Sequence, residues 1–369
     1  MNPFKLERYL AQHEFSAPYV LCCSDAESIG MKELVQMADA EMLHHWQNLR
    51  LQYTESQGMP LLRQEIARVC YPGLTHDNIL CFAGAQEGIY AALRVLCKPG
   101  DHVIVLTPCY QSLRDIPKVA GAEVTCVALR AEEQWRINVT RIAAAMRPTT
   151  RCIIINFPHN PTGQIITAAE LDNLVALCRM QGIWLFSDEV YRLLGTTTEW
   201  APAAAVVYER ALSLGVMSKA FGLAGLRIGW IACQDVTLLN AIKEYKDYLS
   251  ICSSSPSEIL ACMALRKSDY LLTRNNQIVA ANKEKLRAFF AQYAHLFSWV
   301  EPLGGCTGFV RYHGAQNIEA LCADAVMRYG VLLLPGSVYD VAEPYFRIGF
   351  GRSNFVESLQ RFEEYVDGL

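Results

Sequence analysis

Short apolar runs alternate with amphipathic stretches over residues 60–217. The apolar runs lack in-out alternation, which is typical of strands buried on both faces of a mostly parallel sheet. The stretches between them carry apolar residues at helical spacing, so the pattern predicts an α/β fold. The predicted strands are residues 79–83, 102–106, 123–129, 151–156, 183–188 and 211–217, and the predicted helices are residues 31–48, 60–70, 86–97, 110–120 and 167–181.

The pattern changes after about residue 235. Long helical stretches at 236–250 and 256–293 are followed by short strands at 308–312 and 345–350. This α+β character predicts a second, smaller domain. The expected division is an N-terminal segment (1–40) that joins the small domain, a large domain (41–275) and a small C-terminal domain (276–369).

Composition favours a folded enzyme. Of the 369 residues, 52% are hydrophobic and 19% are charged, unlike a disordered chain. The net charge of -4 without a basic block indicates neither a nucleic-acid nor a membrane partner. No run of 18 apolar residues predicts a membrane span, and residues 1–15 lack the apolar core of a secretion signal. Fourteen cysteines without a C-x-x-C pair and eight histidines without ligand spacing predict buried thiols, a reducing cytoplasm and no metal site.

Residue types suited to chemistry follow the predicted strands. In open α/β sheets, ligands bind beyond the carboxyl ends of the strands, so we expect these side chains to share one site. In chain order they are Gly84, Ala85 and Gln86 after 79–83, Tyr110 after 102–106, Asn160 after 151–156, Asp188 and Tyr191 at the end of 183–188, and Ser218 and Lys219 after 211–217.

Their chemistry fits one cofactor. A helix that begins after Gly84 offers free N–H groups to a phosphate, and Arg227 could complete that seat. Desolvation and nearby cations would lower the pKa of Lys219 and allow a Schiff base with an aldehyde. Asp188 could pair with a protonated ring nitrogen, and Tyr110 could stack on the ring. Phosphate, aldehyde and pyridinium ring together describe pyridoxal 5′-phosphate (PLP).

Four motifs in combination carry a family resemblance. They are N-P-T-G at 160–163, D-x-x-Y at 188–191, S-K-x-x-x-x-x-G-L-R-x-G at 218–229 and F-R-I-G-F-G at 346–351. With them the sequence resembles, from Tyr53 to Arg352, a fold-type I PLP enzyme of the class I and II aminotransferase family, a relative of aspartate and histidinol-phosphate aminotransferases. The resemblance implies a large domain with a mostly parallel mixed sheet between helices, and a smaller α+β domain.

The resemblance also implies roles for single residues. Lys219 matches the lysine that binds the cofactor and moves a proton between Cα and C4′, and Asp188 matches the partner of the ring nitrogen. Tyr53 matches the tyrosine that reaches the phosphate in the neighbouring subunit, which implies a homodimer. The remaining matches are Asn160 and Tyr191 to the ring 3-oxygen, Tyr110 to ring stacking, Gly84, Ala85, Gln86, Ser218 and Arg227 to the phosphate, and Arg347, with Asn160, to the substrate α-carboxylate.

The chain departs from the family at two phosphate positions. Val216 stands where a serine or threonine is usual, although Ser218 is present, and Gln86 stands where a small hydroxyl residue is common. Taken singly, several residues also have structural alternatives, such as a helix cap for Asp188, a turn for Asn160 or an ion pair for Arg347.

The expected reaction is transfer of an amino group between an L-amino acid and a 2-oxo acid. Other PLP chemistry on the same scaffold, by a β/γ-lyase or a cyclising synthase, is an alternative, as is a PLP-binding sensor without enzyme activity. The segment 252–257 contains no arginine for a dicarboxylic side chain, which argues against aspartate as the preferred donor. Asp25 and Glu27 would favour a cationic or polar side chain if they face the pocket. Alternatively, either of them caps the helix beginning near Met31.

Overall fold

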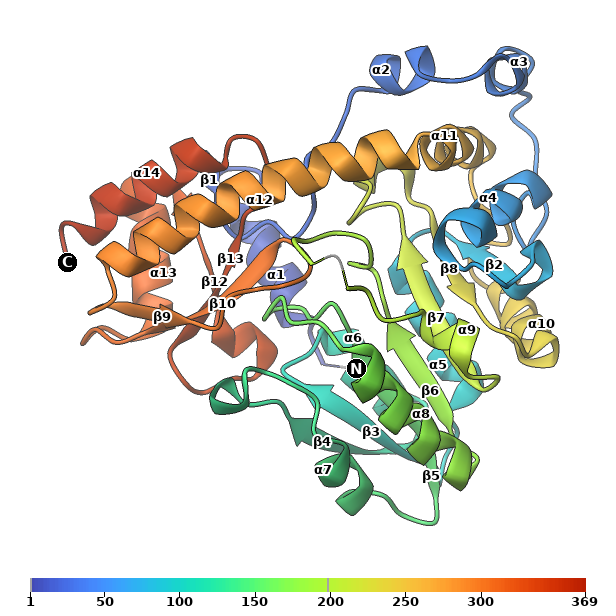
Figure 1. The fold of residues 1–369 in the computed structure, drawn as a ribbon, viewed down its shortest axis with the longest axis horizontal. Coiled ribbons are helices and arrows are strands. Elements are labelled where there is room, and N and C mark those ends of the chain that lie inside the picture. The colour runs from blue at the N-terminus through green and yellow to red at the C-terminus, as the bar shows by residue number, and fades with distance from the viewer. Residues whose placement is uncertain (1, 198) are drawn as a thin grey trace.

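A seven-stranded sheet forms the centre of the molecule in the computed structural model, which describes residues 2–197 and 199–369 (Figure 1). The strand order is β2-β8-β7-β6-β5-β3-β4. Its strands are β2 (Ile79–Phe82), β3 (His102–Thr107), β4 (Glu123–Ala128), β5 (Thr150–Asn156), β6 (Trp184–Asp188), β7 (Ala211–Val216) and β8 (Gly229–Ala232). The six predicted strands are confirmed to within about two residues at each end.

One strand makes the sheet mixed. β8 runs antiparallel to both of its neighbours, β2 and β7, whereas the other pairs are parallel. The apolar-run pattern did not predict β8, because this four-residue strand follows directly on the glycine-rich stretch that contains Lys219. β8 lies between strands whose carboxyl ends carry site residues.

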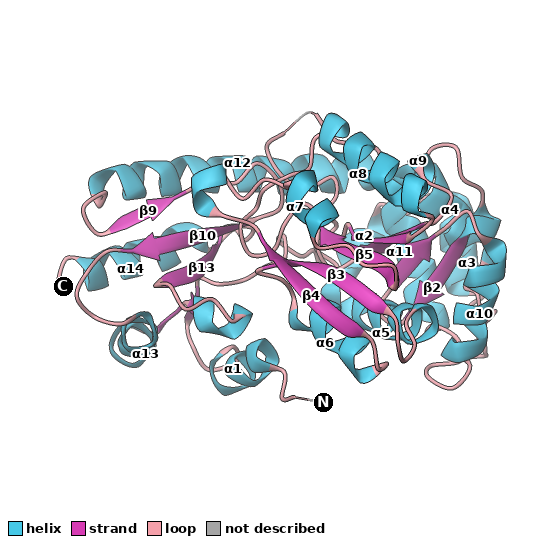
Figure 2. Ribbon diagram, turned by 90° about the horizontal axis from the view of Figure 1, so that it is seen from below, coloured by secondary structure: helices cyan, strands magenta, loops and turns pink. Residues whose placement is uncertain are grey.

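Alternate residues of the strands enter different cores. Within β5, Ile153 and Ile155 pack with helices α7 and α8, whereas Cys152 and Ile154 pack with α5, α6 and α10 on the other face. Figure 2 shows α7 and α8 on one side of β3 and β4, and α5 and α6 on the other. The helices before residue 250 are α1 (Lys5–His13), α2 (Met31–Gln36), α3 (Ala40–Gln47), α4 (Pro60–Cys70), α5 (Ala85–Leu96), α6 (Gln111–Val119), α7 (Val139–Ala144), α8 (Ala168–Gln181), α9 (Ala204–Val207) and α10 (Val236–Lys246).

A second, antiparallel sheet has the order β12-β13-β10-β9. The N-terminal strand β1 pairs in parallel with β11 beside this sheet, so the start of the chain packs with its C-terminal part. The elements are β1 (Tyr19–Val20), β9 (Phe297–Trp299), β10 (Thr307–Tyr312), β11 (Val331–Leu332), β12 (Leu334–Pro335) and β13 (Tyr345–Gly349), with α11 (Ser255–Arg266), α12 (Ser268–Gln292), α13 (Ile318–Tyr329) and α14 (Phe355–Val366). The domain boundaries at 40/41 and 275/276 stay a prediction.

Two predicted helices are each divided in the structure. The stretch 31–48 forms α2 and α3, because Asp39 caps the second helix by accepting a hydrogen bond from the Met42 N–H at 2.9 Å. The stretch 256–293 forms α11 and α12, which meet at Lys267. Apolar spacing continues across both breaks, so periodicity alone indicates one helix where the backbone makes two.

The N-terminal chain crosses the molecule after β1. This crossing segment, residues 21–27, donates from the Glu27 N–H to the Gly351 carbonyl at 2.8 Å and accepts at Leu21 from the Gly349 N–H at 2.7 Å. A Cβ at Gly349 would overlap the Cys23 carbonyl oxygen, and a Cβ at Gly351 would overlap that of Asp25. On its other side, Gly222 meets the Glu27 carbonyl in the same way. The segment therefore fits only between glycines.

Three expectations from the sequence concern its cysteines, membrane spans and metal ligands. All the cysteines are buried except Cys126, which is exposed, and Cys252, which is half-buried, and burial raises the pKa of thiols such as Cys81 to about 12. Within residues 2–197 and 199–369, no helix combines the length and the apolarity that a bilayer crossing requires. The same residues hold no group of three or more potential metal ligands. The cytoplasmic location stays a prediction.

Candidate active site

A cavity of about 400 Å³ lies at the carboxyl ends of the parallel strands. Its wall combines strand ends of the central sheet with the crossing segment, helix α1 and strand β13, so it joins both sheets. Among the predicted site residues, the cavity is lined by Ala85, Gln86, Tyr110, Asn160, Asp188, Tyr191, Ser218, Lys219, Arg227 and Arg347. Gly84 lies next to this wall as the N-terminal cap of α5.

Lys219 follows β7 and presents its amine to the cavity. The amine donates a hydrogen bond to the Ser24 hydroxyl at 2.9 Å and lies 5.6 Å from the centre of the Tyr191 ring. Burial acts to lower the pKa of Lys219, but Tyr191 and Asp25 act to raise it, and the net pKa lies above its usual value. The expected lowered pKa is therefore wrong for the protein without cofactor, because the surrounding acidic groups outweigh desolvation.

Asp188 ends β6 and is only 4% exposed. One carboxylate oxygen accepts a hydrogen bond from the Val190 N–H at 3.2 Å. Burial raises the pKa of Asp188 to about 7, although this hydrogen bond and the charge of Lys219 oppose the shift. No ion pair of Asp188 exists within the described ranges. A buried carboxylate in this state is stabilised by a cationic partner, which a protonated ring nitrogen would provide.

Asn160 and Arg347 meet from opposite sheets. Arg347, in β13, donates from Nη1 to the side-chain oxygen of Asn160 at 3.2 Å and to the Tyr339 hydroxyl at 2.7 Å. Its Nη2 donates to the Cys22 carbonyl at 2.7 Å, and its Nε has no partner within the described ranges. Arg347 is 2% exposed, and burial acts to lower its pKa, while Tyr339 and Tyr191 raise it above its usual value. A buried guanidinium with spare donor capacity beside the cavity suits a carboxylate ligand.

The phosphate seat predicted at α5 has a preformed cradle. Gly84 has φ +91°, and a Cβ there would lie 2.6 Å from Nη2 of Arg227. Arg227 itself takes a left-handed φ of 53°, which costs backbone energy in a non-glycine residue. The N-terminal N–H groups of α5 and one guanidinium thus converge where a phosphate would bind. Val216, which stands where the family usually has a hydroxyl residue, also lines the cavity.

Helix α1 forms the outer wall of the cavity. Leu6, Glu7, Leu10 and Glu14 all line it, and their spacing of one, three and four residues places them on one helix face. Glu7 accepts a hydrogen bond from the Tyr110 hydroxyl at 3.0 Å, and burial, then Glu7, raises the pKa of Tyr110. The sequence pattern of residues 1–15 did not indicate where this helix docks.

The carboxylates proposed for substrate selection lie differently than expected. Asp25 lines the cavity, but it already pairs with Arg352 at 2.9 Å. Glu27 lies outside the cavity wall and accepts hydrogen bonds from the N–H and hydroxyl of Ser353 at 2.6 and 2.7 Å. The helix at Met31 is capped by neither residue, since Gly30 is its cap. Both alternatives are therefore wrong for Glu27, and the N-terminal helix region contributes two further carboxylates to the wall, Glu7 and Glu14.

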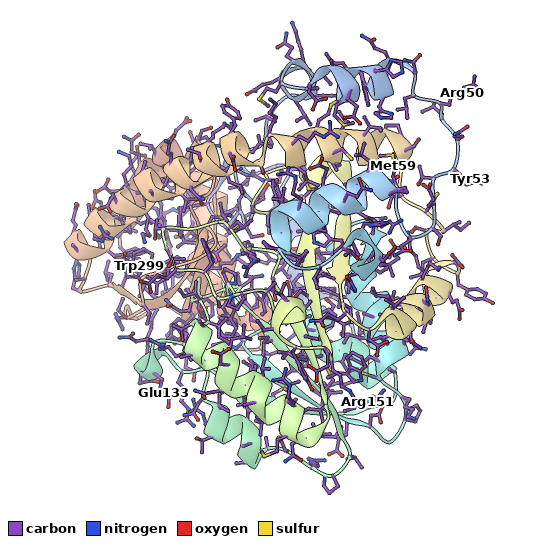
Figure 3. All side chains as sticks on the ribbon, turned by 45° about the vertical axis from the view of Figure 1, so that its right-hand side comes forward. Arg50, Tyr53, Met59, Glu133, Arg151 and Trp299 are labelled. Carbon is purple, nitrogen blue, oxygen red and sulfur yellow. The ribbon has the colours of Figure 1, made fainter. Side chains whose placement is uncertain are left out.

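Tyr53 is the one predicted site residue far from the cavity. It lies on the segment between α3 and α4, points away from the body of the molecule and is 84% exposed (Figure 3). The same segment exposes a second apolar side chain, that of Leu51. The connection between α10 and α11 exposes two more, those of Tyr248 and Ile251. Such exposed aromatic and aliphatic groups are typical of a protein interface.

Four groups of the site were missed in the sequence: Ser24, Tyr339, His159 and the acidic face of α1. Ser24 carried no signal, because its contact with Lys219 joins residues 195 positions apart. Tyr339 carried none either, since it contacts Asn160 across 179 positions and Arg347 across 8. His159 could have been found, since it directly precedes the N-P-T-G motif. Its Nε2 faces the Pro108 carbonyl at 2.9 Å and its Nδ1 faces the Thr162 hydroxyl at 2.8 Å.

The residues present fit PLP. The cradle at Gly84 suits its phosphate, the buried Asp188 suits a protonated pyridine nitrogen, and Lys219 presents an amine in the same cavity. One cofactor would supply a partner to all three of these groups.

The chain belongs to the aminotransferase class I and II family, whose model matches residues 25–359. PLP is therefore its cofactor, and its fold is that of the fold-type I PLP enzymes, as the sequence predicted. Three similar proteins illustrate the range of the family.

Capreomycidine synthase of Streptomyces vinaceus is 31% identical over 355 residues, which cover 94% of this chain and 88% of that protein. The crystal structure of a PLP-dependent aminotransferase from Streptococcus suis superimposes with a TM-score of 0.93 at 30% identity, covering 99% of this chain and 98% of that one. The structure of the PLP-dependent cyclase OrfR superimposes with a TM-score of 0.90 at 27% identity, covering 98% and 97%.

His159 generates a prediction about stability. Because the Pro108 carbonyl can only accept, Nε2 carries the proton and Nδ1 accepts from Thr162, so the native ring is neutral. Burial lowers the pKa of His159 to about 4, below its unfolded value of about 6.5. The unfolded chain therefore binds the extra proton between these values, and His159 reduces stability as the pH falls from 6.5 to 4, by up to about 3 kcal/mol.

The free energy of unfolding, measured by urea denaturation of wild type and His159→Gln, should test this. The advantage of wild type over the variant should be largest above pH 6.5 and shrink toward pH 4. His295→Gln, which removes an exposed histidine, is the control. A wild-type advantage that stays constant from pH 7 to 4 would show that His159 titrates normally in the folded protein.

Proposed function

We propose that this chain is a PLP-dependent enzyme that moves an amino group between an L-amino acid and a 2-oxo acid. The observation that carries the proposal is that one cavity presents the Lys219 amine, the buried Asp188 carboxylate and the buried Arg347 guanidinium together. These are the groups needed to anchor the cofactor, control its ring and bind an α-carboxylate.

PLP supplies an aldehyde that links to amines and a pyridine ring that draws electrons from the bonds at Cα of a linked amino acid. Asp188 would keep the ring nitrogen protonated, because its buried carboxylate would be stabilised by that charge. Arg347 would bind the α-carboxylate, and Asn160, whose side-chain oxygen accepts a hydrogen bond from Arg347, would help to hold the cofactor in the same cavity. Tyr191, over which the Lys219 amine lies, completes the wall behind the amine. Lys219 would take the proton from Cα and, in amino transfer, would deliver it to C4′ of the cofactor.

A cyclising reaction is the second candidate, and two similarities favour it. Capreomycidine synthase matches nearly the whole chain, and the cyclase OrfR shares its fold closely. Both reactions begin with the same removal of the Cα proton, so the residues described here serve either one. The two reactions differ in whether they need a second substrate, because amino transfer requires a 2-oxo acid and cyclisation does not.

We also propose that the substrate side chain is cationic or polar. The cavity wall carries Glu7 of α1 and Glu14 at the C-terminal cap of that helix, whereas Arg352, which also lines the wall, is paired with Asp25. This leaves an excess of negative charge beyond the α-carboxylate site, which attracts a cation in a partly desolvated cavity.

The working unit is proposed to be a homodimer in which Tyr53 of one subunit serves the site of the other. The exposure of Tyr53 outside the cavity of its own subunit, and the apolar side chains near it, support this arrangement.

Covalent attachment of PLP tests the role of Lys219. Borohydride reduction of the cofactor-loaded protein should add the mass of the reduced cofactor to the Lys219 peptide. Lys219→Ala should lose this label and lower the turnover by many orders of magnitude, because anchoring and proton transfer are removed together. Lys98→Ala, at an exposed turn, should keep both. An unlabelled Lys219 peptide from a yellow, active protein would contradict the assignment.

A panel of amino donors tests the reaction and the substrate together. Basic and polar donors should consume a 2-oxo acid and form its amino acid faster than aspartate does. Glu14→Gln should raise KM for basic donors roughly tenfold, as expected for one lost partly buried charge pair. The matched variant Glu244→Gln, on the exposed face of α10, should not.

Two outcomes of the panel would redirect the proposal. Conversion of a donor at full rate without a 2-oxo acid would favour the cyclising reaction over amino transfer. Fast reaction with aspartate and none with basic or polar donors would overturn the assigned side-chain preference.

Mixed dimers test the sharing of sites. Tyr53→Ala and Lys219→Ala homodimers should both be impaired, the latter more strongly. A heterodimer of the two contains one site with an intact lysine and an intact tyrosine from the other subunit, so it should recover about half the wild-type activity per dimer. No recovery, or a fully active monomer in sedimentation, would show that Tyr53 does not serve a neighbouring site.

A further inference from the structure

The amine of Lys219 has an unexpected hydrogen-bond partner. Its Nζ donates to the hydroxyl of Ser24 at 2.9 Å, and the two residues are 195 positions apart. Within residues 2–197 and 199–369, no carboxylate lies at ion-pair distance from this amine. The hydroxyl of Ser24 is thus the group that fixes the direction of the lysine side chain in the protein alone.

The backbone around Ser24 is fixed on both sides. Ala26, two residues on, donates from its N–H to the carbonyl of Lys219 itself at 3.4 Å. Cys22, two residues before, accepts from Nη2 of Arg347 at 2.7 Å. With Gly222 packed against one side of this segment and Gly349 against the other, the hydroxyl is placed by close backbone packing. A hydroxyl held in this way is preorganised for its contact.

Several charged or titratable groups surround the amine. Tyr191 and Asp188 approach it from the end of β6, Asp25 from the crossing segment, Cys306 from the connection before β10 and Arg347 from β13. The acidic groups and Arg347 act on its charge from a distance, whereas Ser24 is the one neighbour that forms a hydrogen bond with it in the described parts of the chain.

We propose that Ser24 is a positioning residue for Lys219, whose hydroxyl accepts a hydrogen bond from the amine and orients it toward the cavity whenever that amine is free. The inference rests on the proposed role of Lys219 as the cofactor-binding and proton-moving group. In each turnover the lysine is released when the substrate takes its place on the cofactor. Its amine must then point at the substrate to move the proton, and the Ser24 hydroxyl keeps it there.

The hydrogen bond from Lys219 to Ser24 should shift the pKa of the lysine in a direction that can be measured. A serine oxygen that accepts from an ammonium group stabilises the charged form and raises the pKa of the lysine. Removing the oxygen should lower that pKa by about one unit, as expected for one hydrogen bond to a charged group. A serine that served only to pack the segment would leave the pKa of Lys219 where it is.

The experiment follows attachment of PLP to Lys219 in cofactor-free protein. The rate is measured between pH 7 and 12, a range that extends above the usual pKa of a lysine because that of Lys219 is raised. The labelled lysine is identified by mass spectrometry after borohydride reduction. Ser24→Ala should move the midpoint of the pH profile down by about one unit. Ser24→Thr, which keeps the hydroxyl, should have the wild-type midpoint. The control Ser28→Ala, which changes an exposed serine four residues further along the chain, should leave the midpoint unchanged. Ser24→Cys is the second variant, for use if Ser24→Ala folds poorly. Its thiol is nearly equal in size to the hydroxyl but is a weak acceptor, so its midpoint should also move down.

Turnover gives a second readout. Ser24→Ala should lower kcat about tenfold while KM changes little, because the contact orients the proton-moving group and does not touch the substrate carboxylate. A midpoint that is unchanged or moves up in both Ser24→Ala and Ser24→Cys would overturn the proposal. Absence of label on Lys219 in wild type would instead overturn the proposed function, so the two failures are distinguishable.

Discussion

The close fit of residues 21–27 between three glycines is the constraint on which the site depends. No Cβ can be placed at Gly222, Gly349 or Gly351 without overlapping a carbonyl oxygen of this segment. The segment can therefore lie directly on both the turn that carries Lys219 and the strand that carries Arg347. Both ends of the cavity are positioned by the same stretch of backbone, through the hydroxyl of Ser24 and the carbonyl of Cys22. Backbone contacts of this kind leave little freedom for either side chain.

The central sheet provides the other half of the arrangement. Its parallel strands end at one edge, so residues from β3, β5, β6 and β7 reach the cavity without long loops. The antiparallel β8 brings Arg227, just before it, to the start of α5, where Gly84 leaves room for the guanidinium. Local turns thus build the cofactor side of the cavity, and the crossing segment and β13 build the substrate side.

This division explains what the sequence could predict. Strands, their order along the chain and the residues that follow them depend on local pattern, so the six strands and ten cavity-lining residues were found in advance. Contacts between residues far apart in the sequence were not predicted. The docking of α1, the pairing of Asp25 with Arg352 and the use of Glu27 on Ser353 all join residues more than 90 positions apart. The pKa of Lys219 was mispredicted for the same reason, because Asp25 and Tyr191 reach it through the fold and not along the chain. The breaks at Asp39 and Lys267 were missed because apolar spacing continues through them.

The separation of these contacts also has a consequence for the order of folding. Cys22 meets Arg347 across 325 positions and Asp25 meets Arg352 across 327, whereas the strands of the central sheet follow one another at short intervals. Closing such long loops is slow, because ordering the intervening chain opposes contact formation until many interactions form at once. On a ribosome, the sheet with Lys219 can form while β13 is still unsynthesised, and the crossing segment must wait for the glycines that receive it. The binding site is thus complete only after β13 has been synthesised and the crossing segment has docked, so a growing chain carries Lys219 for some time without the wall that restrains it.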